Sequence, residues 1–202
     1  MTRRRWLLLL PVALVLVLAA SAGRLQIFWW PSDLRDETSG REGEAIEVVD
    51  VWTDEDGQER ERRFSLTVLS VRPVTFVDGY SGPERVVPPP GVAAWRILLE
   101  FDVDPDVPML GCRVSLLDDR GREADAVGGS LGDALLPGAS CEPKDRRGPD
   151  YTGAYDEDYL PRLQTYVAPQ YVLTADDATP ASVRLWWEPT DYVEVAVEGS
   201  GS

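Results

Sequence analysis

The sequence contains no histidine, and Lys144 is the only lysine among its 20 basic residues. Catalytic triads, Cys–His dyads and the usual zinc sites use histidine, so this chain cannot build them. A single lysine leaves Ser–Lys and Schiff-base chemistry dependent on one side chain. We therefore expect no enzyme and no cofactor, and we look for a binding function instead.

Positive charge is scarce relative to negative charge. The 202 residues include 35 acidic side chains, and the formal net charge at pH 7 is −15. Such a surface repels phosphate backbones, which argues against nucleic-acid partners. Hydrophobic residues still make up 44% of the chain. That share is enough for a folded core, so we do not expect extensive disorder.

The amino-terminal region has the pattern of a membrane segment. Residues 1–5 form a basic cap, residues 6–23 contain no charge, and the apolar character continues to residue 30. A transmembrane helix needs about 20 mostly apolar residues. We predict a signal anchor over 6–30, with the N-terminus cytoplasmic by the positive-inside rule and the rest of the chain extracytoplasmic. The residues expected at the membrane interfaces are Arg3, Arg4, Arg5, Trp6, Trp29 and Trp30.

A cleaved secretory signal is the alternative interpretation of this region. Such a signal has a basic start, a shorter apolar stretch and a small-residue cleavage site, and Ala20-Ser21-Ala22 fits that site. Cleavage after Ala22 would release the protein from the cell membrane. Both interpretations export the rest of the chain, and the aromatic extension through Trp30 favours the anchor.

The remainder of the chain predicts a linker and one β domain. Residues 31–45 are polar and read as a linker, whereas 46–198 alternate apolar and polar residues with the period of strands, and 199–202 form a flexible Gly-Ser tail. The short strands and the Pro, Gly and Asp turns between them indicate an all-β antiparallel sandwich of about seven or eight strands. The expected strands are 46–52, 62–71, 94–103, 111–117, 122–127, 162–173, 182–187 and 192–197.

Cys112 and Cys141 are the only cysteines in the sequence. In an exported chain an isolated pair most simply forms a disulfide, and the alternative is two separate reduced thiols. A bridge would pin the long loop expected over 128–160 to the strand at 111–117.

Aromatic residues supply the candidate binding sites. The segment 150–159 interleaves Tyr151, Tyr155 and Tyr159 with acids, and exposed tyrosines are typical of recognition surfaces. The alternative is a loop whose rings pack inward. Trp186 and Trp187 are adjacent on a strand and must face opposite ways, so one enters the core. We predict Trp187 as a further contact.

Asp102, Asp104 and Asp106 place three acids at alternate positions. Carboxylates from one loop suit calcium, but the glycine and terminal glutamate of an EF-hand are missing and Pro105 stiffens the turn. We therefore expect no metal site, with these three residues as the candidates if one exists.

The chain resembles a known kind of exported protein. The arginine-rich start, the Phe28-Trp29-Trp30-Pro31 run and the acidic β domain look like uncharacterised actinobacterial membrane-anchored proteins. The strand 95–103, the strand and turn at 116–121 and the strand 171–173 are similar to the extracellular immunoglobulin-like family that includes an immunoprotective mycobacterial antigen. The resemblance implies an immunoglobulin-like sandwich over 46–197 and carries over no functional residues. Near-complete replacement of lysine by arginine also indicates a GC-rich source.

These observations predict a non-catalytic, membrane-anchored interaction module of the cell envelope. Its partners would be the membrane, through the N-terminal helix, and another envelope protein or a cell-wall polymer. Two alternatives stay open. One is a calcium-dependent adhesion module, and the other is a glycan hydrolase that uses a pair of carboxylates.

Overall fold

The fold is all-β over the part of the chain that the structure describes. The computed structural model describes residues 33–198, except 55, 80–81, 133 and 137–139. These residues form strands and no helix, and hence no helix able to cross a membrane. The predicted signal anchor, its basic cap and the tail at 199–202 lie outside the described residues.

The described residues form fifteen strands. In chain order they are β1 (Asp36–Arg41), β2 (Ala45–Thr53), β3 (Glu59–Pro73), β4 (Phe76–Gly79), β5 (Gly82–Arg85), β6 (Val92–Val103), β7 (Arg113–Asp118), β8 (Glu123–Asp125), β9 (Gly129–Leu131), β10 (Ala134–Leu136), β11 (Arg146–Arg147), β12 (Leu160–Pro161), β13 (Thr165–Ala175), β14 (Pro180–Trp186) and β15 (Asp191–Ala196).

Four of the longer strands form the first sheet, here called sheet I. Their order is β13-β6-β3-β2, and all neighbours are antiparallel. Alternate residues of β6 from Trp95 to Val103 are buried. Because successive side chains of a strand point to opposite faces, this row forms one apolar surface that needs a second layer.

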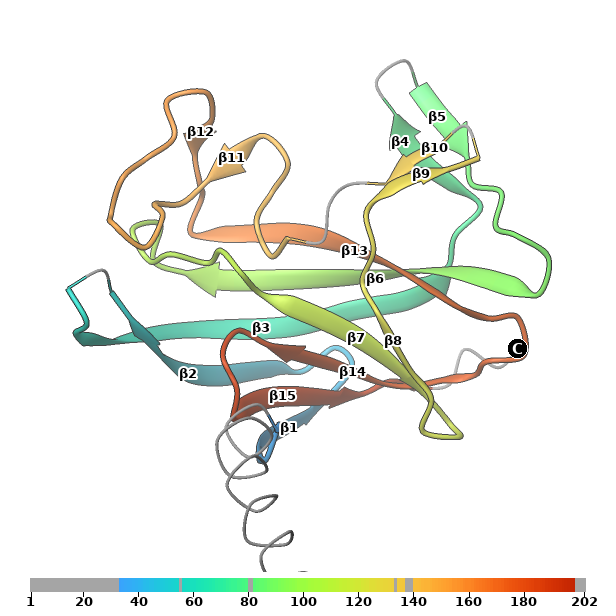
Figure 1. The fold of residues 1–202 in the computed structure, drawn as a ribbon, viewed down its shortest axis with the longest axis horizontal. Coiled ribbons are helices and arrows are strands. Elements are labelled where there is room, and N and C mark those ends of the chain that lie inside the picture. Colours follow the sequence, from blue (N-terminus) through green and yellow to red (C-terminus); the bar gives the residue numbers. More distant parts are fainter. Residues whose placement is uncertain (1–32, 55, 80–81, 133, 137–139, 199–202) are drawn as a thin grey trace, which may run out of the picture.

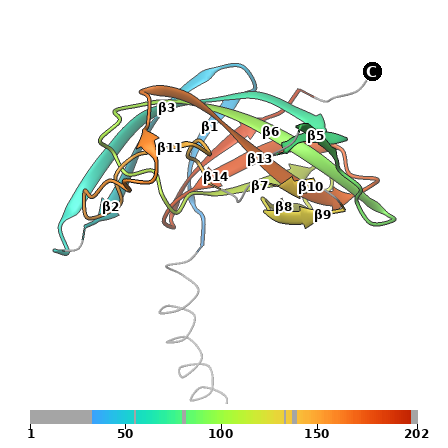
Figure 2. The ribbon, with the colours of Figure 1, turned by 90° about the horizontal axis from the view of Figure 1, so that it is seen from above.

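The second sheet, sheet II, supplies that layer, with the order β1-β15-β14-β7-β8. Leu116 of β7, Leu185 of β14 and Val195 of β15 pack in the same core as Leu66 and Leu99 of sheet I. Figures 1 and 2 show the two layers facing each other. The predicted β-sandwich is therefore confirmed, and each of the eight expected strands corresponds to an observed one.

The sandwich is closed along one side. Ala126, just after β8, forms a bridge with Val172 of β13, and the amide of Val127 donates to the carbonyl of Tyr171 at 2.8 Å. These contacts join the β8 edge of sheet II to the β13 edge of sheet I. On the opposite side of the sandwich, β1 is the edge strand of sheet II and β2 is the edge strand of sheet I.

At that opposite side the chain turns a sharp corner between β1 and β2. The amide of Glu42 donates to Ala196 of sheet II, whereas that of Gly43 donates to Val68 of sheet I. A Cβ atom on Gly40 would lie 2.2 Å from Cδ1 of Ile46, so glycine gives Ile46 its space at the corner. From this corner the two strands enter different sheets.

The linker predicted over 31–45 is wrong in part, because β1 lies within it. This strand pairs with β15, in parallel, so the sandwich is also not wholly antiparallel. Its sequence, DETSGR, has no apolar alternation, and its residues are mostly exposed. Backbone pairing with β15 therefore holds the strand in place, and side-chain burial contributes little.

The strand order also differs from that of an immunoglobulin domain. There, the third strand crosses to the second sheet. Here, β2, β3 and β6 follow one another within sheet I. The loop expected over 128–160 also contains short strands, and Ala134 and Leu136 of β10 pack with Val77 and Val86 in a second apolar cluster. Strands of three residues are too short to show a repeating pattern in the sequence.

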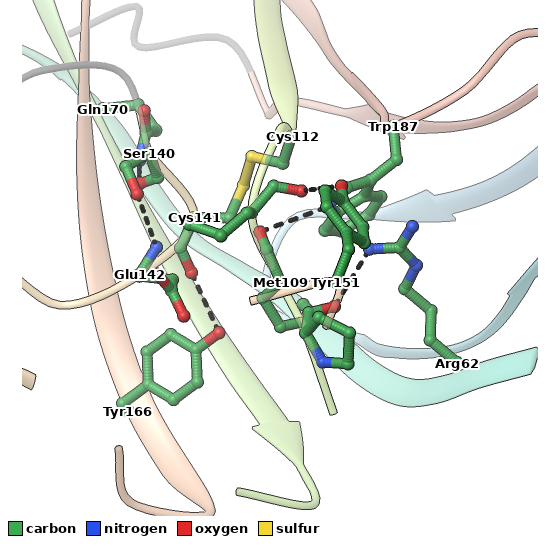
Figure 3. Close-up of a disulfide and its surroundings, with 12 residues drawn as sticks. Arg62, Met109, Cys112, Ser140, Cys141, Glu142, Tyr151, Tyr166, Gln170 and Trp187 are labelled. Atoms are coloured by element: carbon green, nitrogen blue, oxygen red, sulfur yellow. Dashed lines mark hydrogen bonds between the residues drawn. A yellow bond between two sulfur atoms is a disulfide. The ribbon is translucent and has the colours of Figure 1, made fainter. Parts of the chain in front are cut away.

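The predicted disulfide between Cys112 and Cys141 is confirmed, with the Cα atoms 5.8 Å apart. Figure 3 shows it between Trp187 and Arg62 on one side and Tyr166 and Glu142 on the other. Because the cysteines are separated by 29 positions, the bridge ties a long irregular segment to the start of β7.

Reduction of the disulfide should therefore lower stability. Chain-entropy arguments give a loss of about 3–4 kcal/mol for a loop of this length. The measurement is urea unfolding of the wild type with and without reductant, which leaves both buried side chains in place. The double variant Cys112→Ala/Cys141→Ala, insensitive to reductant, is the control. Equal midpoints for oxidised and reduced wild type would contradict this contribution.

Candidate functional site

The three tyrosines of the segment 150–159 do not form one surface. The ring of Tyr151 packs on Trp52, with centroids 5.3 Å apart, and its hydroxyl donates to the carbonyl of Leu110 at 2.6 Å. Tyr159 lies under the guanidinium of Arg147, which is 3.8 Å from the ring centroid. Both rings are half-buried and hold the segment against the sandwich.

Tyr155 is the exposed member of this set, with 45% of its surface accessible. Its hydroxyl donates to Oδ1 of Asp106, and this hydrogen bond raises the pKa of Tyr155. Tyr155 also borders a hollow of about 290 Å³ that Glu142, Arg147 and Asp150 help to line. Of the three predicted tyrosine contacts, Tyr155 is the one that the structure leaves exposed.

A buried ion pair lies beneath this hollow. Arg162 and Glu142 are both almost fully buried, with Nη1 and Oε1 3.3 Å apart. Nη2 of Arg162 donates to the carbonyl of Val107 at 2.6 Å and to that of Asp104 at 2.9 Å. The amide of Gly148 donates to Glu142. Burial raises the pKa of Glu142, and the hydrogen bond from Gly148 and the nearby arginines only partly offset this effect.

The prediction of Trp187 as a surface contact is wrong. Trp187 is 7% exposed, its Nε1 donates to the carbonyl of Met109 at 3.2 Å, and its ring meets Phe64 edge-on with centroids 5.0 Å apart. Figure 3 shows Trp187 beside Arg62. Its neighbour Trp186 is half-buried, so the two side chains do divide between the inside and the outside.

The three alternate aspartates turn to different protein partners. Asp102 accepts hydrogen bonds from Gln164 and Thr165, Asp104 accepts one from the amide of Asp106, and Asp106 accepts one from the hydroxyl of Tyr155. Over the described residues, no group of three potential ligands is arranged to hold a metal ion.

The largest change from the sequence-based picture is a groove at the open side of the sandwich. It encloses about 410 Å³, a volume in the range of ligand sites. Residues 36–38 of β1 and 48–50 of β2 form its two walls, and we call it the β1–β2 groove. The other lining residues are Arg35, Leu185, Trp186, Trp187, Asp191, Tyr192 and Val193.

Asp50 is a buried carboxylate in this groove. Its Oδ2 lies 2.6 Å from Nε of Arg62, and the two side chains are 6% and 0% exposed. Arg62 also donates to the carbonyl of Pro108 at 3.0 Å and lies 5.0 Å from the ring centroid of Trp187. Asp50 and Arg62 are directly opposite each other on β2 and β3, which explains the contact.

The surroundings of Asp50 disfavour its charged form. Burial raises the pKa of Asp50 and outweighs the opposing influence of Arg62. The carboxylates of Asp191 and Glu188 raise it further, because each adds negative charge nearby. A carboxyl group perturbed in this way beside a groove is a recognised mark of a functional site.

Sequence reasoning missed Asp50, Arg62, Glu142 and Arg162. A usable signal existed for the first pair. Asp50 takes an even-numbered position of β2, as the buried Val48 and Trp52 do. Arg62 takes an even-numbered position of β3, as the buried Phe64 does. Both charges therefore belong to the inner faces. For Glu142 and Arg162, which lie in irregular segments, the sequence offers no comparable signal.

No protein-family profile and no curated protein matches the sequence. Among solved structures, the chain is similar to an uncharacterised β-sandwich protein from Clostridium difficile 630. The identity is 10%, the TM-score is 0.42, and the alignment covers 81% of this chain and 95% of that one.

The Asp50–Arg62 pair predicts a non-additive effect of mutation. Arg62→Met or Asp50→Val alone leaves one buried charge unpaired and should cost about 3–5 kcal/mol, whereas the double variant should be close to wild type. Urea unfolding of all four proteins measures this cycle. Arg63→Met, which removes an exposed ion pair with Glu61, is the control and should change stability by at most about 1 kcal/mol. Additive losses would contradict the coupling.

Glu142 predicts a specific pH dependence of stability. Because the folded-state pKa is raised above its ordinary value of 4.5, native Glu142 takes up a proton before the unfolded chain does. The stabilisation that this proton uptake gives is complete below pH 4.5, and it is lost as the pH rises through the folded-state pKa of Glu142. The stability of wild type relative to Glu142→Gln should therefore increase as the pH falls from neutral towards 4.5. Urea midpoints across this range measure it, and a constant or shrinking difference would contradict the assignment.

Proposed function

We propose that this protein is a non-catalytic interaction module displayed outside the cytoplasm and held at the membrane by the segment 6–30. The observation that supports it best is the β1–β2 groove, an accessible hollow between two strand edges with Trp186 in its wall. Half-buried tryptophans beside a hollow are typical contact residues of protein interfaces.

The position of the groove along the chain agrees with a site near the membrane. Arg35 lines the groove and follows residue 30, the proposed end of the anchor, by five positions. A chain of that length spans at most about 18 Å. An anchored domain would therefore present the groove close to the bilayer, where neighbouring envelope proteins are also confined. A second hollow, which Trp186 and Arg184 help to line, adjoins the same region.

The two other functions have less support from the geometry. The three candidate calcium ligands each contact a different protein group. Two of the buried carboxylates, Asp50 and Glu142, line different hollows, and each lies against an arginine. A glycan hydrolase needs two carboxyls facing one substrate site.

The proposal includes the kinship suggested by the sequence, that is, an actinobacterial protein related to extracellular immunoglobulin-like sandwiches and to the immunoprotective antigen family. The two-layer architecture and the disulfide are compatible with an exported domain of that general kind. The strand order departs from the immunoglobulin pattern, so the kinship is proposed at the level of location and architecture.

Cell fractionation with intact-mass measurement tests the location. We expect the full-length mass in membranes washed with alkaline carbonate, and we expect added protease to digest the domain in intact spheroplasts. The variant Ala20→Leu/Ala22→Leu, in which the cleavage pattern is removed, is the control and should behave identically. A mature chain that begins at Gly23 and appears in the medium would contradict the anchor. Protection from protease would contradict display outside the cytoplasm.

Chemical cross-linking in intact cells tests the interaction itself. A photoreactive amino acid at position 186 would lie in the wall of the groove, and one at position 72, on the exposed end of β3, is the matched control. We expect a defined adduct with an envelope component from position 186 only. Identical adducts from both positions, or none from position 186, would contradict the groove as the contact site.

A further inference from the structure

The edge of β2 is open along the β1–β2 groove. β2 ends sheet I on one side and β13 ends it on the other. The β13 edge is bridged to sheet II through Val172, and Pro169 interrupts its donors. β2 contains neither lysine nor proline, the residues that commonly protect edge strands.

The register shows which backbone groups of β2 are available. The amide of Asp54 donates to the carbonyl of Gln58 at 2.9 Å, in line with the register that pairs Thr53 with Glu59. Hydrogen-bonded pairs alternate along an antiparallel ladder. The backbone amides and carbonyls at the even-numbered positions of β2 therefore point to β3. The amides and carbonyls of Glu47, Val49 and Val51 therefore point away from β3, towards the open edge.

The side chains of the same positions define one half of the recognition pattern. Val49 and Val51 are 49% and 42% exposed, so apolar surface accompanies the unpaired backbone groups. A strand added at this edge would place residues directly opposite Val49 and Val51 on the outer face of sheet I. Apolar residues at those two positions would cover both valines.

The groove defines the other half. In the added strand, the residue between the two that face Val49 and Val51 would lie opposite Asp50 and point inward. The residues that line this groove include one arginine, Arg35, and four acids, of which Asp50 is paired with Arg62: Asp36, Glu37, Asp50 and Asp191. A basic side chain is the one that this surplus of negative charge would attract.

A second copy of this chain is a poorer occupant than a basic segment. Each copy has a formal net charge of −15, and pairing of two β2 edges would bring together two strands that each carry Glu47 and Asp50 and no basic residue. Surfaces with charge of the same sign repel each other. The charge pattern thus selects a partner of opposite sign.

We infer that β2 accepts an extended partner segment of alternating apolar and basic residues by strand addition in the β1–β2 groove. This inference rests on the proposed function and gives the chemistry of its partner. Main-chain hydrogen bonds to Val49 and Val51 would supply affinity, and the inward basic residue would supply specificity.

Isothermal titration calorimetry tests this inference on the full-length protein in phosphatidylcholine nanodiscs, a neutral lipid surface. The probe is a blocked seven-residue peptide in which valine alternates with arginine. We expect saturable binding that a peptide with glutamate in place of arginine lacks, together with slower hydrogen exchange of the β2 amides. Binding without protection of β2, or equal binding of both peptides, would overturn strand addition.

Variants at position 49 separate backbone pairing from surface charge. Val49→Pro removes an outward amide and leaves the even-numbered ladder to β3 intact, so it should weaken binding by about tenfold. The matched control Val49→Thr keeps the amide and the branched shape and should stay within about twofold of wild type. Equal affinity of the proline and threonine variants would overturn the assignment.

A charge variant keeps the test decisive if the proline variant does not fold. Asp191→Lys reverses an exposed charge in the groove and should weaken the arginine peptide by about tenfold at low salt. Unchanged affinity in this variant would overturn the charge pattern. A concentration-dependent dimer with protected β2 amides would instead identify a second copy as the occupant. Loss of peptide binding alone leaves the cross-linking result at position 186, and therefore the proposed function, untouched.

Discussion

The ion pair between Asp50 and Arg62 links three separate segments at the open side of the sandwich. Arg62 is fully buried, yet it touches β2 through Asp50, the loop after β6 through the carbonyl of Pro108, and the end of β14 through the ring of Trp187. Two charges inside a core are costly unless each is compensated. The three segments must therefore meet in one arrangement, and this requirement fixes how sheet I lies on sheet II at the open side.

A second arginine does the same for the irregular half of the chain. Arg162 donates to carbonyls of the loop 104–107 and pairs with Glu142, which in turn accepts from Gly148. A Cβ atom on Gly148 would lie 2.7 Å from Nη1 of Arg162, so the loop closes directly over the guanidinium. Arginine offers five donors in a fixed plane, which lysine does not. In a chain with one lysine, arginine is the side chain available to organise long loops.

The regular strands could be predicted from the sequence, because their burial repeats with period two. β1 could not be, since DETSGR has no such repeat and the strand is held mainly by main-chain pairing with β15, which a sequence pattern does not reveal. The disulfide followed from there being one possible partner for each cysteine. The groove could not be foreseen, because it depends on β1 and β2 leaving the same corner for different sheets. Alternation along the strands does place Asp50 and Arg62 on the inner face. It also places Trp187 inside, two positions after the buried Leu185.

An open strand edge usually endangers a soluble domain, since two copies can pair through it. The net charge of −15 changes that balance. The charges that discourage a second copy are long-range, whereas the backbone groups of Glu47, Val49 and Val51 act only at contact. Acidity thus protects the edge against the most abundant competitor, the chain itself, without any lysine or proline on β2. The same charges favour a segment of opposite sign, so protection and recognition come from one property of the surface.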